Sequence, residues 1–435
     1  MRLWKRGPCG ACEKEQRSEI MKFKLTKDEK KWVMYDVGNS AFTLMISTIL
    51  PIYFNYLAGN AGLSEVSYLA YWGYAASITT LIVAVLGPVL GTLADTKGFK
   101  KPIFVAFIAV GVVGCIGMGF TSSWLVFLII FILAKVGYSG SLIFYDSMLP
   151  DITTEKRMDD VSSQGYAWGY IGSCVPFLAS LVLVLMYDKI GITMNVAMTI
   201  AFVIIAVWWV GMTIPLLRIY QQKHYVERQP NAFKESFLRI GRTLRDVKKH
   251  KKIFLFLLAF FFYIDGVYTI IDMATAYGSA LGLDTTGLLL ALLVTQIVAF
   301  PFAILFGRLA SKYATEKLII VCIFAYLGIA IFAIFLAHQW QFWVLAVCVG
   351  MFQGGIQALS RSYFTKIIPP EQTGEYFGLL DICGKGASFV GTTLVGVVSQ
   401  ISGDINTGVG AIAVLFVIGI FFFLKTTKVK GEEAR

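Results

Sequence analysis

The stretch "GTLADTKGFKK", residues 91–101, is a short polar segment between two long apolar runs. Its glycines permit tight turns and a close approach of helices. Asp95 can accept hydrogen bonds from the free N–H groups at the start of another helix, while Lys100 and Lys101 add positive charge directly after the turn. The stretch therefore predicts a tight loop that connects two apolar helices and whose Asp95 binds the start of a third helix.

The composition shows what kind of protein surrounds this loop. Of 435 residues, 57% are hydrophobic, 14% are aromatic and only 15% are charged, and the mean hydropathy is +0.70. A soluble core cannot bury that much apolar surface, so the chain is predicted to be an integral membrane protein. The net charge of +11 lies in short segments between apolar runs, which favours anionic lipid over nucleic acid as the counter-surface.

A bilayer core of about 30 Å requires roughly 20 apolar residues per helix. The sequence contains twelve such stretches, which predicts an all-α membrane protein with twelve transmembrane helices. The predicted spans are 32–57, 68–94, 102–120, 124–149, 164–187, 194–219, 253–280, 286–310, 317–337, 341–366, 375–401 and 405–424.

The basic residues between these spans predict the orientation, because Lys and Arg accumulate in cytoplasmic loops. With both termini in the cytoplasm, 34 of the 38 basic residues fall inside, and Lys189 alone falls outside. We therefore expect a multi-pass protein of the cell membrane. The predicted organisation is a cytoplasmic tail (1–31), a six-helix half (32–219), a cytoplasmic linker (220–252), a second six-helix half (253–424) and a cytoplasmic tail (425–435).

The linker contains a basic amphipathic pattern. Phe233, Phe237, Ile240, Leu244 and Val247 recur at intervals of four and three, with Lys and Arg between them. The pattern predicts a helix on the cytoplasmic surface of the membrane. A groove on a partner protein is the alternative.

The first residues, "MRLWKRGPCGACEKEQRSEI", lack the continuous apolar core of a signal peptide, and Met21 is a second candidate for the natural start. Cys9 and Cys12 form an isolated CxxC pair, which is weak support for a metal site. The other five cysteines lie in predicted helices. We expect no disulfide, no metal, no cofactor and a monomeric protein.

The two halves echo each other. A shift of 228 residues places Tyr35 and Gly38 on Tyr263 and Gly266, with Asp36 and Asp265 one position out of register. A second, degraded copy of the opening loop, "FGRLASKYATEK", follows at 306–317 with Ser311 in the place of the carboxylate. A parallel repeat of six helices is typical of transporters built from two halves.

Both copies resemble the loop signature of the major facilitator superfamily. Further stretches are similar to the unknown-major-facilitator family, relatives of the fungal vacuolar amino-acid effluxers of autophagy: "YDVGNSA" (35–41), "FYDSMLPDI" with "VSSQGYAWGYIG" (144–172), "FYIDGVYTII" (262–271), "GGIQALSRS" (354–362) and "EYFGLLDICGK" (375–385). The resemblance runs from about Trp32 to Lys425. It implies a secondary transporter with the major facilitator fold, in a compact form without the extra loops of the fungal members.

Charges inside the membrane are expensive, so they mark candidate functional residues. Within the predicted spans, leaving aside residues at the helix edges, they are Asp36, Lys135, Asp146, Asp265, Asp272, Arg361, Asp381 and Lys385. They fall on the first, fourth, seventh, tenth and eleventh helices, whereas the third, sixth, ninth and twelfth carry no comparable interior charge. In the major facilitator fold the latter helices face lipid, so the charges are expected to line a central cavity.

Three of these charges are predicted to be structural. Arg361 and Asp381 share a depth on adjacent helices, which favours a salt bridge between them. Asp146 lies near the cytoplasmic end of the fourth predicted helix, and Lys100 and Lys101 lie in the loop on the same side of the membrane. Pairing with either lysine would complete a conformational latch together with Asp95, as the superfamily pattern implies.

The remaining charges predict a substrate or coupling site. Lys135 lies too deep to reach either surface, and Asp265 and Asp272 share one helix face within reach of Lys385. Polar and aromatic residues complete the candidate set, which comprises Asn39, Tyr145, Tyr263, Tyr268, Thr269, Gln296, Gln353 and Gln357. For a Gln or Tyr taken alone, a role as interhelical glue is the competing interpretation.

A pocket with both signs of charge and several amides suits a small zwitterion such as an amino acid. The alternatives are a lipid or lysolipid translocator, a carrier of sugars or anionic metabolites, and a membrane receptor or scaffold. No nucleophile with a base, phosphate loop or metal cluster points to an enzyme.

Because no histidine lies in a span, we expect protons to couple through a carboxylate, first Asp265 and then Asp36. Sodium coupling and uncoupled transport are the alternatives.

Overall fold

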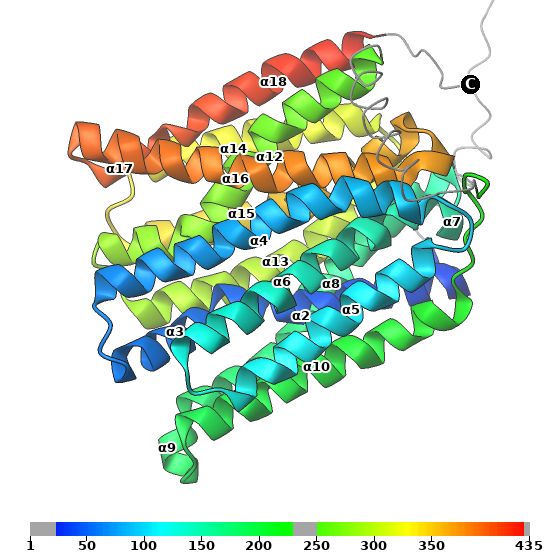
Figure 1. Ribbon diagram of the computed structural model, residues 1–435. Helices are drawn as coiled ribbons and strands as arrows, with labels where there is room; N and C mark the ends of the chain where they lie inside the picture. The colour runs from blue at the N-terminus through cyan, green and yellow to red at the C-terminus, as the bar shows by residue number, and fades with distance from the viewer. Residues whose placement is uncertain (1–22, 229–249, 430–435) are drawn as a thin grey trace, which may run out of the picture.

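The computed structural model describes residues 23–228 and 250–429. In these residues the chain consists of long, roughly parallel helices joined by short connections (Figure 1). The predicted amphipathic segment 233–249 and the Cys9–Cys12 pair lie outside the described residues.

The helices follow one another along the chain with few residues between them. In order they are α2 (Lys27–Ser47), α3 (Ile49–Asn60), α4 (Glu65–Ala94), α5 (Lys100–Gly117), η1 (Met118–Phe120), α6 (Trp124–Ser147), α7 (Leu149–Ile152), η2 (Glu155–Arg157), α8 (Met158–Leu185), α9 (Tyr187–Ile190), α10 (Met194–Ile219), α12 (Lys251–Ala280), α13 (Thr285–Ala310), α14 (Thr315–Ala333), α15 (Gln339–Ile367), η3 (Pro370–Gln372), α16 (Thr373–Ser402), α17 (Ile405–Gly410) and α18 (Ile412–Lys428).

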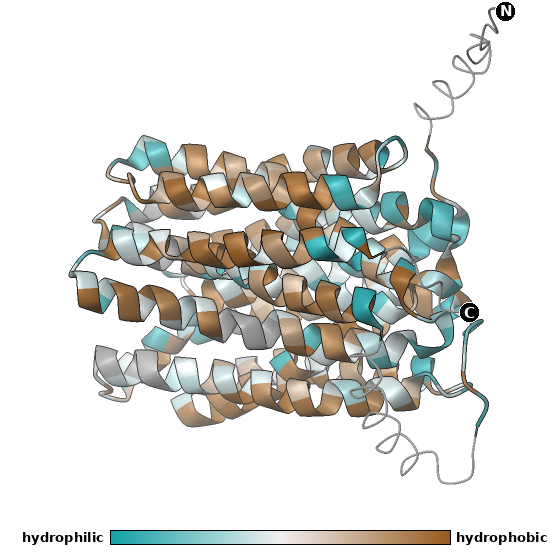
Figure 2. Ribbon diagram, turned by 90° about the horizontal axis from the view of Figure 1, so that it is seen from above, coloured by the Kyte–Doolittle hydropathy of each residue, from teal (hydrophilic) through white to brown (hydrophobic). Residues whose placement is uncertain are grey.

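The predicted architecture is confirmed, because each predicted span coincides with one of these helices or with a consecutive pair. Ten spans in the described residues are long and apolar enough to cross a membrane, and α2 with α3, bent by 40°, forms an eleventh. The twelfth is α16, which has 30 residues but is strongly apolar only over Val390–Ser402. Figure 2 shows the apolar residues along the helices and a concentration of polar residues at one end.

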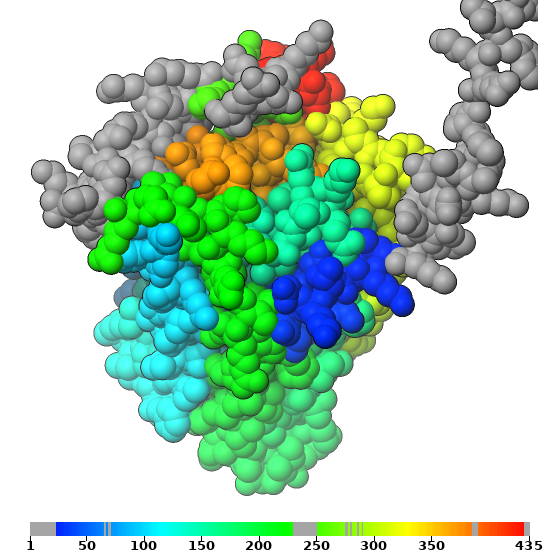
Figure 3. All heavy atoms as spheres, turned by 90° about the vertical axis from the view of Figure 1, so that its right-hand side faces the viewer, coloured from blue at the N-terminus to red at the C-terminus, as the bar shows by residue number. Residues whose placement is uncertain are grey.

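We call this polar end the basic end. At this end α2 begins at Lys27, α5 begins at Lys100, α12 begins at Lys251 and α18 ends at Lys428, and the loop between α4 and α5 carries Lys97. Figure 3 looks onto this end: the segment that follows α10, in green, lies across the surface between the loop after α4, in light blue, and the start of α16, in orange.

The buried apolar residues form two clusters. One extends from Trp32 to Tyr220, and the other consists mainly of residues between Ile253 and Phe423. A matched hydrogen bond occurs in each: the Tyr35 hydroxyl donates to Ser141 Oγ at 2.6 Å, and the Tyr263 and Ser360 hydroxyls lie 2.7 Å apart. The echo of Tyr35 in Tyr263 thus corresponds to an equivalent contact in three dimensions.

The helices α4 and α16 meet most closely near the basic end. A Cβ atom added to Gly91 would lie 2.2 Å from the Gly374 carbonyl oxygen, and one added to Gly378 would lie 2.8 Å from the Gly87 backbone. Toward the other end, a Cβ atom on Gly73 or Gly396 would meet nothing within 4 Å. The absence of side chains at the first four glycines therefore allows these two backbones to touch at the basic end.

We expect Gly91→Ala to destabilise the protein, because its methyl group cannot fit without moving the α16 backbone. Overpacking of this kind costs roughly 1–3 kcal/mol and should lower the midpoint of thermal unfolding in detergent. Gly73→Ala, on the same helix but facing open space, is the control and should leave the midpoint unchanged or raise it. Equal midpoints for the two variants would contradict the close approach of α4 and α16.

Candidate functional site

The site is centred on Arg361, a guanidinium of α15 whose polar partners all come from α2, α6 and α8. Its Nε donates to Ser162 Oγ at 2.8 Å and its Nη2 to the Ser162 carbonyl at 2.9 Å. Nη1 donates to Asp146 Oδ1 at 2.9 Å, and both Nη atoms lie 3.4 Å from Asp36 Oδ2. Arg361 is only 4% exposed. We call these partners and the surrounding rings the Arg361 socket.

Aromatic rings form the walls of the Arg361 socket. The guanidinium lies 4.7 Å from the Trp32 ring centroid and 4.4 Å from that of Tyr166, distances at which a cation is attracted to a ring face. Tyr145 stacks on Trp32 and donates its hydroxyl hydrogen to Asp36 Oδ2 at 2.8 Å. Gly165 adds space, since a Cβ atom there would lie 2.3 Å from Asp36 Oδ2.

The predicted pair of Arg361 with Asp381 is wrong. The two residues share a depth, but depth does not determine the direction in which a helical side chain points, and Arg361 points toward Asp36 and Asp146. The pairing predicted for Asp146 with Lys100 or Lys101 is wrong for the same reason. Ser162, Trp32 and Tyr166 were missed because a serine or an aromatic residue in an apolar run has no distinguishing sequence signal.

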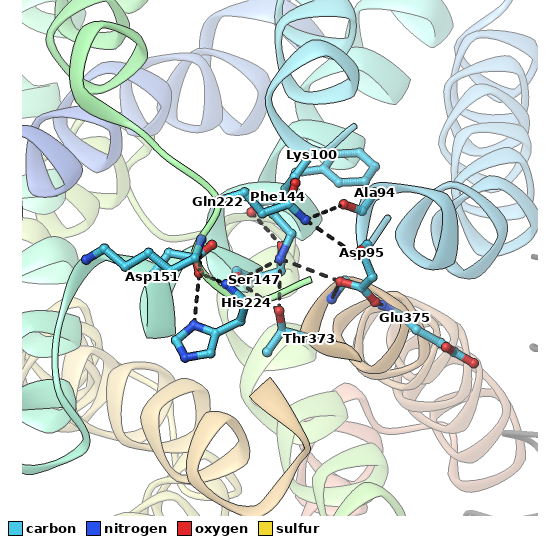
Figure 4. A network of polar contacts seen from close by, with 12 residues as sticks. Ala94, Asp95, Lys100, Phe144, Ser147, Asp151, Gln222, His224, Thr373 and Glu375 are labelled. Atoms are coloured by element: carbon cyan, nitrogen blue, oxygen red, sulfur yellow. Dashed lines mark hydrogen bonds and ion pairs between the residues drawn. The ribbon is translucent and has the colours of Figure 1, made fainter. Parts of the chain in front are cut away.

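The predicted role of Asp95 agrees with the structure. Its two carboxylate oxygens accept hydrogen bonds from the first free amides of α16, Gly374 N at 2.8 Å and Glu375 N at 2.9 Å, where the helix dipole also favours a negative charge. Lys100 is fully buried, lies 3.5 Å from Asp95, and donates to the Ser147 carbonyl and to Thr373 Oγ1 at 3.3 and 3.0 Å (Figure 4). Lys101 is only partly buried.

A second group of contacts at the basic end involves the segment 220–228 that follows α10. Asp151 accepts from the Tyr220 hydroxyl at 2.6 Å and from His224 through its amide and Nδ1 at 2.9 and 3.0 Å. Gln222 donates to the Ala94 carbonyl at 3.0 Å, and Val226 forms an isolated β-bridge with Thr96. We call this segment the strap, because it is bound along its length to the loop that carries Asp95 (Figure 4).

The strap groups lie outside the membrane spans, and their pKa values reflect their contacts. Burial raises the pKa of Asp151, but the hydrogen bond from His224 and the charge of Lys100 outweigh burial and leave it below its usual value of 3.8. The hydrogen bond to Asp151 raises the pKa of His224 above 6.5 against the opposing effect of burial. An ionised Asp151 paired with a protonated His224 is therefore the favoured state below neutral pH.

A contact that corresponds to the Asp95 contact joins α8 to the helices α14 and α15. Asp159 lies at the start of α8 and accepts from Ser362 Oγ at 2.6 Å, from Thr315 Oγ1 at 2.9 Å and from Lys366 Nζ at 2.5 Å. Gly307 of the degraded loop copy packs closely on Ser163. The loop copy at 306–317 has Ser311 where the first loop has Asp95. The carboxylate that joins the helices here is therefore Asp159, which belongs to α8.

Toward the middle of the bundle the side chains are more accessible. Asp272 is exposed although it lies 21 residues into α12, and its carboxylate interacts electrostatically with Lys135 of α6. Thr43 is also exposed, and its hydroxyl lies 2.5 Å from that of Tyr138. Asp146 is 23% exposed and Asp381 is partly exposed. Thr43, Asp272 and Asp381 thus face accessible space beyond the Arg361 socket, of which Asp146 is a part.

Asp265 differs from these carboxylates because it is fully buried. Its Oδ1 accepts from Gly391 N of α16 at 3.0 Å and from Thr269 Oγ1 at 3.3 Å. Its Oδ2 has no hydrogen-bond partner among the described residues. Gly391 is required here, since a Cβ atom would lie 2.1 Å from Thr269 Oγ1 and 2.6 Å from Asp265 Oδ1.

The other predicted site residues are distributed through the bundle. Asn39 is buried and donates to the Tyr35 carbonyl of its own helix at 2.9 Å, and Gln357 Oε1 accepts from the Tyr170 hydroxyl at 3.0 Å. Gln296 is partly exposed and its buried Oε1 has no partner in the described part of the chain. Gln353 is 8% exposed. The side chain of Lys385 lies outside the described structure.

Comparison with known proteins identifies the family. The sequence profile described as "Vacuole effluxer Atg22 like" matches residues 26–158 and 153–435, nearly the whole chain. The chain belongs to this Atg22-like family. The protein named as an uncharacterized MFS-type transporter YxiO of Bacillus subtilis (strain 168) is 42% identical over 402 residues, which cover 91% of this chain and 94% of the relative. Autophagy-related protein 22 of Coccidioides immitis (strain RS) is 21% identical over 450 residues, covering 85% of this chain and 74% of the relative.

Solved structures show the fold of this Atg22-like chain. The transporter FucP of the major facilitator superfamily, in an outward conformation, aligns with a TM-score of 0.70 at 13% identity and covers 92% of this chain and 98% of FucP. The human organic anion transporter MFSD10 aligns with a TM-score of 0.68 at 12% identity, over 90% of this chain and 97% of MFSD10. The protein is a membrane transporter of the major facilitator superfamily and not an enzyme, as the sequence predicted.

Removal of the Arg361 charge should leave the buried Asp36 and the partly exposed Asp146 without their cation. We expect Arg361→Met to lower the stability of the Atg22-like protein by roughly 3–5 kcal/mol, measured as folded yield and thermal midpoint in detergent. Addition of Asp146→Asn should recover part of the loss, because it removes one uncompensated charge. Asp381→Asn in the same background is the control, and a recovery as large as that from Asp146→Asn would contradict the observed pairing.

The strap should make stability depend on pH through His224. Because the pKa of His224 is raised in the folded state, its contribution is fully present below pH 6.5 and is lost as pH rises through the folded-state pKa. We expect the thermal midpoint of His224→Gln to fall below that of wild type in acid and to converge with it at alkaline pH. A difference between the two proteins that grows with pH would show that the strap contact has another origin.

Proposed function

We propose that the protein is a proton-coupled secondary transporter that moves a small zwitterion, such as an amino acid, across the cell membrane by alternating access. In this proposal the basic end faces the cytoplasm, in keeping with the accumulation of Lys and Arg there. The two six-helix halves rock against each other around a central site. The family resemblance found in the sequence implies the same substrate class.

Alternating access requires contacts between the halves that form and break. Arg361, the Asp95 carboxylate at the start of α16, and the pair of Lys366 with Asp159 all connect the halves, and all three lie toward the basic end. These contacts favour the conformation in which the basic end is closed. Opening of that end must break them, so any ligand that drives the opening must bind the open form more tightly.

The observation that carries the proposal of proton coupling is the environment of Asp265. A carboxylate with no exposure and with one oxygen lacking a hydrogen-bond partner in the described structure is poorly stabilised in its charged form. A proton on that oxygen would remove the penalty. A change in solvent access between the two conformations would then load and release the proton, which is how a buried Asp couples proton movement to transport.

The accessible side chains support a zwitterionic substrate. Asp272 and Asp381 offer negative charge to an ammonium group, Lys135 offers positive charge to a carboxylate, and Thr43 and Tyr138 supply hydroxyl groups. A sugar carrier would need fewer charges and more aromatic platforms. The charge pattern thus favours an amino acid over a neutral solute.

In liposomes we expect Asp265→Asn to abolish accumulation driven by a proton gradient, because asparagine imitates the permanently protonated acid. Counterflow exchange of radiolabelled amino acid should persist, since exchange requires no net movement of protons. The variant should also fold well, because its amide oxygen still accepts from Gly391 and Thr269.

Arg361 provides the contrasting variant for this assay. Arg361→Lys keeps the charge but loses the planar donor set, so it should impair accumulation and exchange together. Accumulation that persists in a well-folded Asp265→Asn protein would exclude Asp265 as the proton carrier. Loss of folding in this variant would show that Asp265 acts mainly as a structural acceptor.

A further inference from the structure

The strap at the basic end carries a titratable group that the proposed transport cycle does not use. His224 Nδ1 lies 3.0 Å from Asp151 Oδ1, and the His224 amide donates to the same oxygen at 2.9 Å. The Asp151 carboxylate is buried, but 36% of the His224 side chain is exposed. A proton from the water on this side of the protein can therefore reach the imidazole.

The strap is bound along its length to the loop between α4 and α5. The Val226 amide donates to the Asp95 carbonyl at 2.8 Å. The Gln222 side chain donates to the Ala94 carbonyl and accepts from the Gly98 amide, both at 3.0 Å. These bonds fix the backbone on either side of Asp95 to the strap, so the position of the strap determines the position of Asp95 (Figure 4).

The same loop holds the start of α16. The Asp95 carboxylate accepts hydrogen bonds from the Gly374 and Glu375 amides at 2.8 and 2.9 Å. Lys100 lies 3.5 Å from Asp95, and its charge also lowers the pKa of Asp151. The contact of the strap with Asp151 and the contact of Asp95 with α16 are thus electrostatically connected through one lysine.

Charged groups from several elements act on His224. The hydrogen bond to Asp151 of α7 raises the pKa of His224 most, the negative charge of Glu371 in η3 raises it further, and burial and the charge of Lys100 in α5 oppose both. Asp151 and Lys100 belong to the group of helices that precedes the strap. Glu371 lies directly before α16, in the group that follows it. A proton on His224 therefore creates a positive charge that attracts a carboxylate from each group of helices.

We propose that the strap is a pH switch, in which a proton on His224 attracts Glu371 and keeps the basic end closed. Loss of the proton removes this attraction and weakens the closed form. Because the proton stabilises the closed form, opening of the basic end favours its release. With this end in the cytoplasm, acidification of the cytoplasm slows the transporter. The inference rests on the alternating access and the orientation of the proposed function, but neither on its substrate nor on proton coupling at Asp265.

The test measures hydrogen–deuterium exchange in the purified full-length protein, in detergent and without a ligand. The Gly374 and Glu375 amides are protected by Asp95 in the closed form and lose this protection when the basic end opens. His224→Gln keeps a hydrogen-bond donor for Asp151 but cannot take up a proton. At about pH 6 its α16 amides should exchange roughly two- to fivefold faster than those of wild type. At about pH 9 histidine is neutral, and the two proteins should exchange equally.

Glu371→Gln tests the attraction between the two groups of helices. It leaves His224 and Asp151 in place, and because Glu371 is exposed the variant should fold normally even if His224→Gln does not. At about pH 6 the start of α16 should exchange faster than in wild type. The His224 amide should remain protected, because the strap is still bound to Asp151.

Two controls separate opening from other effects. His250→Gln removes an exposed histidine directly before α12 and should behave as wild type at both pH values. The Val196 amide accepts no influence from the strap, since it donates to Thr193 at the start of α10, near the opposite end. It should exchange equally in all of these proteins, whereas a general loss of stability would accelerate it.

The outcomes decide for or against the pH switch. Equal exchange of His224→Gln and wild type at about pH 6, or a difference that persists at about pH 9, would overturn it. Fast exchange in His224→Gln with wild-type behaviour of Glu371→Gln would also overturn it, because His224 would then act only within the first group of helices. The measurement needs no transported substrate, so failure of the pH switch leaves the proposed substrate class standing, and failure to transport amino acids leaves the pH switch standing.

Discussion

A buried guanidinium must keep its partners, and this requirement organises the whole transporter. Arg361 belongs to α15, but every group that receives its hydrogen bonds lies on α2, α6 or α8. Withdrawal of Arg361 would leave Asp36 and Asp146 as neighbouring carboxylates without a cation, which is costly in a medium of low polarity. The closed form of the basic end is thus a defined state with fixed polar contacts, and not merely one position in a continuous movement.

The other contacts at the basic end also stabilise its closed form, but they use different chemical groups. Asp95 uses the free amides of α16, Asp159 uses hydroxyl groups and a lysine, and the glycines of α4 and α16 allow the two backbones to touch. The strap adds a fourth element, because it fixes the loop that carries Asp95 against Asp151. Because the contacts of Asp95, of Asp159 and of the glycines all join the same two groups of helices, the loss of one weakens the geometry of the others.

The sequence predicted the long-range architecture well and the pairings poorly. Apolar length and the distribution of Lys and Arg follow from the bilayer itself, which explains why the helices appear where expected. Asp95 was also predictable, because a carboxylate between the end of an apolar helix and a glycine turn has few possible partners other than a helix start. Arg361 and Asp146 were not, because a one-residue change in helical rotation turns a side chain by about 100° and depth alone cannot detect it. His224 and Asp151 are 73 positions apart, and no local pattern links them.

The two buried carboxylate sites differ in a way that separates their roles. Asp36 and Asp146 share a permanent cation, so their charge is compensated as long as the basic end stays closed, and they suit a lock. The hydrogen bonds described for Asp265 come from a backbone amide and a hydroxyl group, neither of which carries charge. Its charged state is therefore the weakly supported one, and a proton or the ammonium group of a ligand can supply the missing positive charge. In the proposed mechanism a proton would be gained and lost at Asp265 without any contact to Arg361, which separates the proposed coupling site from the lock.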